Sequence, residues 1–202
     1  MNKGALFVTG IGTGVGKTVV SAILTESLKA DYWKPIQSGD LDDSDTMKVQ
    51  SVVSNNRTVF HPETYRLTQP YSPHKSADLD GVNITVDNFK LPETDNTLII
   101  EGAGGLMVPL NNNDLMIDLI EKLNTEVVLV VQHYLGSINH TLLSLSLLYS
   151  RNIPVRAIVF NGDADEYSES VIKAHSEGEK FIHIPQLPVF DKATIAAQRV
   201  VI

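Results

Sequence analysis

One stretch near the start of the chain restricts the possible folds more than any other, because three distinct patterns follow one another without a gap. Residues 5–9 form an apolar, partly β-branched run, which predicts a buried strand. Residues 10–16 contain four glycines and lead directly into Lys17 and Thr18. Apolar residues then recur at helical spacing over 19–29. A strand, a glycine-rich loop ending in Gly-Lys-Thr and a helix together predict a loop that binds phosphate.

The physical reason lies in the backbone of such a loop. Glycine accepts positive φ and can turn its N–H inward, and a helix N-terminus adds free donors and a positive dipole end. Lys17 is expected to neutralise the outer phosphates, and the Thr18 hydroxyl to ligate Mg²⁺. The usual Walker A spacing would put the first glycine at Ile11, so the loop is one residue longer here. An ordinary glycine turn is the alternative, but the Gly-Lys-Thr ending favours binding of a nucleoside triphosphate.

Two more strand ends carry charged residues. Lys34 lies at the end of a short strand predicted from residue 31, just before Pro35, at the edge where open α/β sheets bind ligands. A solvated lysine is the alternative. Glu101 ends the predicted strand 97–100, an arrangement typical of Walker B with Glu in place of Asp. We expect Glu101 to serve a metal ion, and a structural buried acid is the alternative.

Four acidic residues lie between positions 40 and 45, ahead of a helix predicted over 46–54. They could form a cap cluster favoured by the helix dipole, or one of them could serve the same Mg²⁺ as Thr18. Spacing alone does not choose among them.

Strands and helices alternate along the rest of the chain. We expect strands at 63–67, 106–110, 126–131, 155–160 and 181–184, and helices at 86–91, 114–123 (capped by Asn113 or Asp114), 135–150 and 165–176. Residues 69–74 are expected to form a loop, and 193–202 either a helix or a loose tail. This alternation predicts an α/β protein with a P-loop NTPase-like three-layer fold, its mainly parallel sheet lying between helices, as one domain over 1–202.

Composition excludes several other classes of function. The absence of cysteine rules out disulfides, zinc thiolate sites and cysteine catalysis. A net charge of −8 without a basic stripe argues against nucleic-acid binding, and no apolar run approaches the length of a membrane span. The first residues lead directly into a predicted strand and leave no room for a signal peptide, so a cytoplasmic enzyme is expected.

Several motifs together resemble the dethiobiotin synthetase family. The matching segments are Gly10–Thr18, Lys34–Gly39 (Lys-Pro-Ile-Gln-Ser-Gly), Ser44-Asp45, Ser72–His74, Glu101–Gly105 (Glu-Gly-Ala-Gly-Gly), Leu135–Thr141, Asn161 and Ile184–Leu187. They follow the order of the family and span most of residues 5–188. The glycine loop is shared by many ATPases. The segments Lys34–Gly39, Glu101–Gly105 and Leu135–Thr141 are much more specific to this family.

The resemblance implies ATP-dependent closure of a cyclic urea from 7,8-diaminononanoate and CO₂, through a carbamate and a carbamic-phosphoric anhydride. It implies catalytic roles for Thr13, Lys17 and Lys34, and Mg²⁺ ligation by Thr18, Asp45 and Glu101. Substrate contacts are implied for Lys34, Ser38, Gly136, Ser137, Ile138, Asn139 and, more loosely, Tyr167. ATP contacts are implied for Gly12, Thr13, Gly14, Val15, Gly16, Lys17, Thr18, Val19, Glu101, Gly102, Gly104, Gly105, Asn161, Pro185, Gln186 and Leu187.

The resemblance also implies a homodimer in which the start of the helix at 135–150 reaches the carboxylate tail of the substrate from the neighbouring subunit. That helix is apolar nearly all round, which suits an interface, with a fully buried core helix as the alternative.

Two departures from the family pattern concern the nucleotide. Gly12 and Gly14 stand where many relatives carry acids, and no clear match follows Pro188 for the family's later nucleotide-facing residues.

Three other classes of protein share the glycine loop. ParA- or MinD-like ATPases carry a signature lysine five residues before the loop lysine, where this chain has Gly12. A cobyrinate-type amidotransferase requires a nucleophilic cysteine, and a GTPase requires an Asn-Lys-x-Asp motif, and the sequence contains neither.

Overall fold

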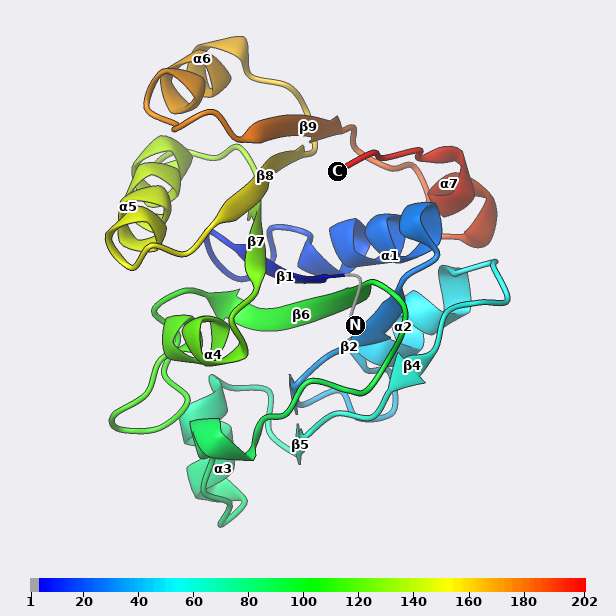
Figure 1. Cartoon of the computed structure of the whole chain (residues 1–202), viewed down its shortest axis with the longest axis vertical. Coiled ribbons are helices and arrows are strands. Elements are labelled where there is room, and N and C mark those ends of the chain that lie inside the picture. The colour runs from blue at the N-terminus through cyan, green and yellow to red at the C-terminus, as the bar shows by residue number, and fades with distance from the viewer. Residues whose placement is uncertain (1–3) are drawn as a thin grey trace.

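A computed structural model describes residues 4–202 (Figure 1). Its centre is a seven-stranded sheet in which every strand pair is parallel, in the order β4-β2-β6-β1-β7-β8-β9. The strands are β1 (Ala5–Gly10), β2 (Asp31–Trp33), β4 (Phe60–His61), β6 (Leu98–Gly105), β7 (Glu126–Val131), β8 (Val155–Asn161) and β9 (Lys180–Ile184). Two short strands, β3 (Ile36–Ser38) and β5 (Tyr65–Leu67), form a separate parallel pair.

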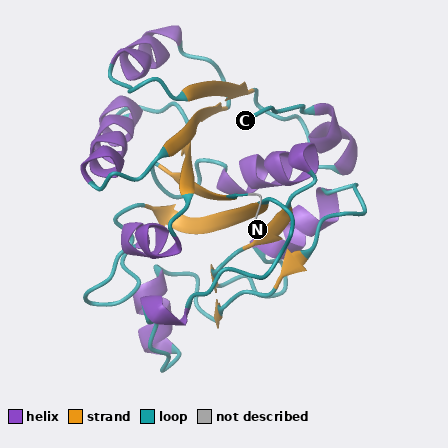
Figure 2. Ribbon diagram, viewed as in Figure 1, coloured by secondary structure: helices purple, strands orange, loops and turns teal. Residues whose placement is uncertain are grey.

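Helices cover both faces of the sheet, as a parallel sheet requires (Figures 1 and 2). One face packs against α1 (Lys17–Leu28), α2 (Asp45–Val52) and α7 (Lys192–Ala197). The other packs against α4 (Met116–Leu123), α5 (Ser137–Ser150) and α6 (Glu166–Ala174), with α3 (Pro73–Leu79) and the 3₁₀ turn η1 (Val86–Asn88) beside the β3–β5 pair. The predicted three-layer α/β fold is therefore confirmed. No helix within the described residues is long and apolar enough to cross a membrane.

Strand alternation decides which charges reach the same side of the sheet. In β6, Ile99 packs into the α1 layer and Ile100 into the opposite layer, so Glu101 returns to the α1 side. In β2, Tyr32 packs into the α1 layer and Trp33 into the opposite one, and Lys34 follows on the side of Tyr32. Because β2 and β6 are neighbours, this parity brings Lys34 and Glu101 together under the start of α1.

Three sequence expectations about strands and loops are wrong. No strand forms at 106–110, where Leu106 and Leu110 are buried in the core and a single antiparallel bridge joins Pro109 to Leu115. The expected loop 69–74 ends early, because Pro73 starts α3. β6 does not stop at Glu101 but continues to Gly105, where it still pairs with Gly10 of β1.

Helix ends also differ from expectation. Leu115, rather than Asn113 or Asp114, precedes α4, and the Asp118 carboxylate accepts the Leu115 N–H at 2.7 Å. The helix expected over 86–91 is only the short turn η1. The segment 193–202 combines both alternatives, since α7 covers its first half and the last residues have no regular structure.

Candidate active site

A cavity of about 660 Å³ opens at the carboxyl ends of β1, β2 and β6. The start of α1, the ends of β2 and β6 and the start of α2 line one part of it, and residues 70–73 form a facing wall. Of the sequence-predicted residues, it brings together Thr13, Gly14, Gly16, Lys17, Thr18, Val19, Lys34, Ser38, Asp45, Glu101, Gly102 and Gly104. This is the sheet edge at which open α/β folds bind ligands.

The glycine loop leads into α1 through Gly16, which precedes the helix with φ of +91°. A Cβ at this position would lie 2.0 Å from the Asn161 side chain, so only glycine fits the close approach. Asn161, at the end of β8, donates to the Val15 carbonyl at 3.1 Å. The loop is thereby attached to a strand two places away in the sheet, which places the predicted base-reading asparagine against the phosphate loop.

Lys17 is buried and donates to the Gly12 carbonyl at 2.9 Å. Burial lowers the pKa of Lys17 to about 8, and the attraction of Glu101 opposes this shift only in part. The loop therefore holds a cation that is poorly solvated and that, among the described residues, donates to a single carbonyl. An anionic phosphate would supply the missing countercharge.

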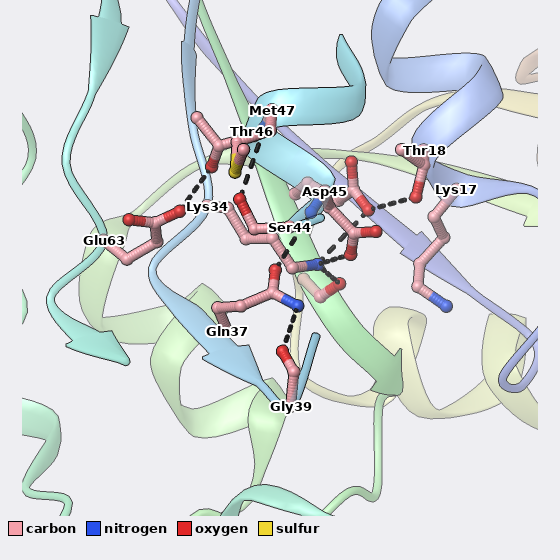
Figure 3. A network of polar contacts seen from close by, with 12 residues as sticks. Lys17, Thr18, Lys34, Gln37, Gly39, Ser44, Asp45, Thr46, Met47 and Glu63 are labelled. Carbon is pink, nitrogen blue, oxygen red and sulfur yellow. Dashed lines mark hydrogen bonds and ion pairs between the residues drawn. The ribbon is translucent and has the colours of Figure 1, made fainter. Parts of the chain in front are cut away.

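Lys34 is 4% exposed, so the interpretation as a solvated lysine is wrong. Its ammonium lies 2.7 Å from Asp45 Oδ2 (Figure 3) and 3.2 Å from Glu101 Oε1. Burial by itself would lower the pKa of Lys34, but the two carboxylates outweigh it and the pKa is raised. Lys34 is thus a fixed cation at the mouth of the glycine loop.

Glu101 is 1% exposed and is held by three donors. Thr18 Oγ1 donates to Oε1 at 2.8 Å and Lys34 approaches the same oxygen, whereas the Tyr32 hydroxyl donates to Oε2 at 2.9 Å. A buried carboxylate costs little only when it is paired in this way. The charge of Glu101 is therefore compensated by these donors, and its carboxylate lies at the cavity, where a ligand can reach it.

Asp45 is singled out among the acids at 40–45 by its contact with Lys34. Ser44, not an acid, caps α2 by accepting the Met47 N–H at 3.3 Å, and Asp45 follows as the first helical residue. Burial would raise the pKa of Asp45, but the charge of Lys34 lowers it. The remaining acids of the segment, Asp40, Asp42 and Asp43, are exposed.

The oxygen donors around Lys34 fit a small divalent cation. Thr18, Asp45 and Glu101 converge on one part of the cavity, and hydroxyl and carboxylate oxygens are what Mg²⁺ prefers. Residues 4–202 contain no cluster of three or more His, Cys, Asp or Glu side chains suited to a metal. A site with two carboxylates matches a cation that takes its other ligands from phosphate and water.

Ser38 and the facing wall occupy the side of the cavity away from the glycine loop. The Ser38 hydroxyl is buried and has no hydrogen-bond partner within the described residues. Gly39 packs so closely on Pro70 that a Cβ there would lie 2.6 Å from it, which fixes the wall against the end of β3. Tyr71 on this wall is half exposed, with the Lys75 ammonium 3.6 Å from its ring centre.

The remaining predicted residues lie outside this cavity. Gly12 and Gly105 line a second cavity of about 340 Å³ beside α5, and Val15 is buried in the core. Residues 185–187 follow β9 next to Gly162, whose N–H donates to the Ile184 carbonyl. Gly136, Ser137, Ile138 and Asn139 form the start of α5, and Tyr167 is 89% exposed. In one chain these last five residues do not line the cavity of Lys34.

Sequence reasoning missed two buried polar residues. Tyr32 donates to Glu101, and Gln37 joins two segments by donating to the Gly39 carbonyl and accepting the Asp45 N–H. A signal was present for Tyr32, because it shares the strand face of Lys34 in the pattern of alternation. None was present for Gln37, whose partners are set by tertiary packing.

The chain is similar to known proteins over most of its length. A family model described as an AAA domain matches residues 4–194. Two similar relatives are ATP-dependent dethiobiotin synthetases. That of Christiangramia forsetii is 52% identical over 189 residues, covering 94% of this chain and 91% of the relative. That of Cytophaga hutchinsonii is 46% identical over 195 residues, covering 96% and 94%.

Solved structures of lower identity share the fold alone. A ParA family ATPase from Chlorobium tepidum is 15% identical with a TM-score of 0.52, covering 97% of each chain. The MinC:MinD complex of Aquifex aeolicus contains a chain that is 15% identical with a TM-score of 0.53, covering 92% of this chain and 82% of that one.

Proposed function

Because this chain belongs to the ATP-dependent dethiobiotin synthetase family, we propose that it forms dethiobiotin, ADP and phosphate from 7,8-diaminononanoate, CO₂ and ATP. The observation that carries the proposal is Lys34, a buried cation between two carboxylates, beside a glycine loop with its own buried lysine. Two fixed cations at one cavity suit a reaction between two anions, a carbamate and a triphosphate.

The reaction needs charge stabilisation more than a strong base. One amine adds to CO₂ and loses a proton to give a carbamate, and a carbamate oxygen attacks the γ-phosphorus of ATP and expels ADP. The second amine then attacks the carbonyl carbon of the mixed anhydride, loses a proton and expels phosphate, which closes the ring. Negative charge develops at the transferring phosphoryl group, where fixed cations stabilise it.

We assign the charges of this chain accordingly. Lys17 and Thr13 face the phosphates, and Lys34 with Ser38 meets the carbamate. The unpartnered Ser38 hydroxyl supports this assignment, because a buried donor without a partner is costly until a ligand accepts from it. At the base end, we assign the nucleotide to Asn161 and the segment 185–187, on the strength of the contact between Asn161 and the loop.

We further propose Mg²⁺ as the cofactor, held by Thr18, Asp45 and Glu101. When bound, it supplies positive charge to the outer phosphates of ATP. Lys34 bridges the two carboxylates, which keeps the acids from repelling one another.

The proposed working unit is a homodimer in the cytoplasm, where ATP is available. Two large apolar side chains that line the second cavity, Met107 and Leu143, are exposed, and so is Tyr134, whose hydroxyl hydrogen-bonds His140 of the same lining. Such a patch favours burial against a second copy. The start of α5, with N–H groups suited to a carboxylate, and the exposed Tyr167 would then serve the substrate tail in the neighbouring subunit.

The proposed reaction is tested by measuring ADP release with and without 7,8-diaminononanoate and bicarbonate, together with mass detection of dethiobiotin. ADP release that requires both compounds and yields the ring product is expected. ATP turnover that is independent of the diamine would contradict the proposal and favour a switch ATPase.

A subunit-mixing experiment tests the shared site. Lys17→Ala chains are mixed with Asn139→Asp chains, whose added charge repels the substrate carboxylate. Activity is expected to reappear in the mixture, because one hybrid site combines the intact loop of one chain with the intact α5 of the other. Full activity of an isolated monomer would contradict the dimer proposal.

A further inference from the structure

Tyr32 is a fully buried residue with a polar group directed at the active site. Its side chain is 0% exposed, and its ring packs on Phe60 with centroids 5.9 Å apart and planes at 50°. Its hydroxyl donates to Glu101 Oε2 at 2.9 Å, across 69 residues of sequence. A phenol is a large group to place in a core solely to satisfy one carboxylate oxygen, since packing alone would be served as well by Phe.

The two oxygens of Glu101 therefore have different surroundings. Oε1 faces the cavity, where Thr18 donates at 2.8 Å and Lys34 approaches to 3.2 Å. Oε2 faces the buried side, where Tyr32 occupies it. Because the phenol lies on β2, between β4 and β6 in the sheet, and packs on Phe60, it fixes the rotation of the carboxylate as well as one of its lone pairs.

We propose that Tyr32 is a positioning residue that leaves Glu101 one oxygen for a cation and so biases the site toward Mg²⁺ over Ca²⁺. This rests on the proposed role of Glu101 as a metal ligand. Calcium takes six to eight oxygens and readily binds a carboxylate through both of them, whereas magnesium requires a compact octahedron of single oxygens. A carboxylate with one oxygen held by a buried phenol suits the smaller cation.

The test compares Tyr32→Phe with the wild type. Binding of a non-hydrolysable ATP analogue is measured by calorimetry while Mg²⁺, or separately Ca²⁺, is titrated, so that turnover is not the readout. Tyr32→Phe is expected to raise the half-saturating Mg²⁺ concentration about 10-fold, the scale of lost outer-shell partners. The half-saturating Ca²⁺ concentration is expected to change by less than about threefold, because Glu101 Oε2, freed from the phenol, becomes available to Ca²⁺.

Tyr65→Phe is the matched control. The Tyr65 hydroxyl accepts from the Thr85 N–H and Asn88 Nδ2, away from Glu101, so its removal also costs hydrogen bonds, one part-buried and one exposed. Neither cation titration should change in this variant. If Tyr32→Phe does not fold, the same titrations are made on Phe60→Leu, which loosens the support of the Tyr32 ring.

Equal shifts for the two cations, or no shift, would overturn the proposal and leave Tyr32 a packing residue. Glu101→Gln separates this result from a failure of the metal assignment. If Glu101→Gln raises the Mg²⁺ requirement and Tyr32→Phe does not, only the role of Tyr32 is wrong. If Glu101→Gln leaves the Mg²⁺ requirement unchanged, the metal assignment itself is wrong.

Discussion

Strand β2 has a buried charge at each end, and the two charges are held by different kinds of partner. Asp31 begins the strand and is 3% exposed, whereas Lys34 follows its last residue and is 4% exposed. Exposure therefore does not distinguish them. The two residues differ in their surroundings. The end of the strand with Asp31 contacts loops, and the end with Lys34 contacts the cavity.

Asp31 is satisfied mainly by neutral donors. It accepts from the Val59 N–H at 2.9 Å, Thr94 Oγ1 at 2.6 Å and Asn96 Nδ2 at 3.2 Å, and His61 lies 3.5 Å away. Burial would raise the pKa of Asp31, but these donors, with Thr94 foremost, lower it. The carboxylate ties two loops to the strand, and Asp31 is not among the residues that line the cavity of Lys34.

Lys34 is held instead by groups that a ligand can exchange. Both of its carboxylate partners, Asp45 and Glu101, line the cavity and are the proposed metal ligands. A buried ion pair is weak support for stability, since desolvation offsets much of its attraction. The comparison teaches that the partners of a buried charge, rather than its burial, separate a structural role from a functional one.

Lys17→Ala should have the largest effect and sharpens the comparison, because Lys17 is a buried cation whose single hydrogen-bond partner within residues 4–202 is the Gly12 carbonyl. We expect turnover to fall by roughly 10,000-fold, the scale of a cation that stabilises a transferring phosphoryl group. The melting temperature should stay close to that of the wild type. Near wild-type ADP release from the folded variant would contradict the phosphate-loop assignment.

Lys34→Ala should lower diamine-dependent turnover by about 1,000-fold while nucleotide affinity remains within about threefold. The reason is that the cation at the carbamate is lost but the glycine loop is intact. Turnover and nucleotide affinity are measured on the same preparation. A parallel loss of both would make Lys34 a phosphate ligand instead.

Asp31→Asn should destabilise the fold by about 2 kcal/mol at neutral pH without changing turnover, because charge-assisted hydrogen bonds at a buried site are lost. The pKa of Asp31 is lower in the folded than in the unfolded chain, so its contribution is present above the unfolded value of 3.8. It is lost as the pH falls through the folded pKa, and the stability difference between variant and wild type should shrink below about pH 4.

Denaturant unfolding across pH measures this difference, with the exposed Asp87→Asn as control. Asp87 pairs with Lys122 on the surface, so its substitution should leave the stability close to that of the wild type. Loss of turnover in folded Asp31→Asn would contradict the contrast between Asp31 and Lys34, because Asp31 would then contribute to the reaction and not to stability alone.

Asp45→Asn should have the smallest effect, raising the half-saturating Mg²⁺ concentration about 10-fold. It removes the nearer carboxylate of Lys34 and one proposed cation ligand while the Ser44 cap of α2 remains. The half-saturating Mg²⁺ concentration is measured from the Mg²⁺ dependence of ADP release. An unchanged Mg²⁺ titration would contradict the role of Asp45 as a cation ligand and leave it a residue of the first turn of α2.

Local patterns of the sequence predicted most of the framework. The apolar runs of β1 and β7, the glycine loop and the first turn of α1 were recognisable because their signals lie within a few residues of one another. Residues 106–110 show the limit of this reasoning. Leu106 and Leu110 are buried whereas Met107 is 62% exposed, and the segment pairs with no strand within residues 4–202, so the two leucines are buried without a ladder.

The sequence by itself determined which residues could be charged ligands at strand ends, namely Lys34 and Glu101, since hydrophobic runs stop at them. Only the tertiary structure decided that they meet. Lys34 and Glu101 are 67 residues apart, and their contact depends on β2 lying beside β6 and on both side chains emerging on the α1 face. Strand order and register arise from packing between distant segments, and a local period of apolar residues carries no information about them.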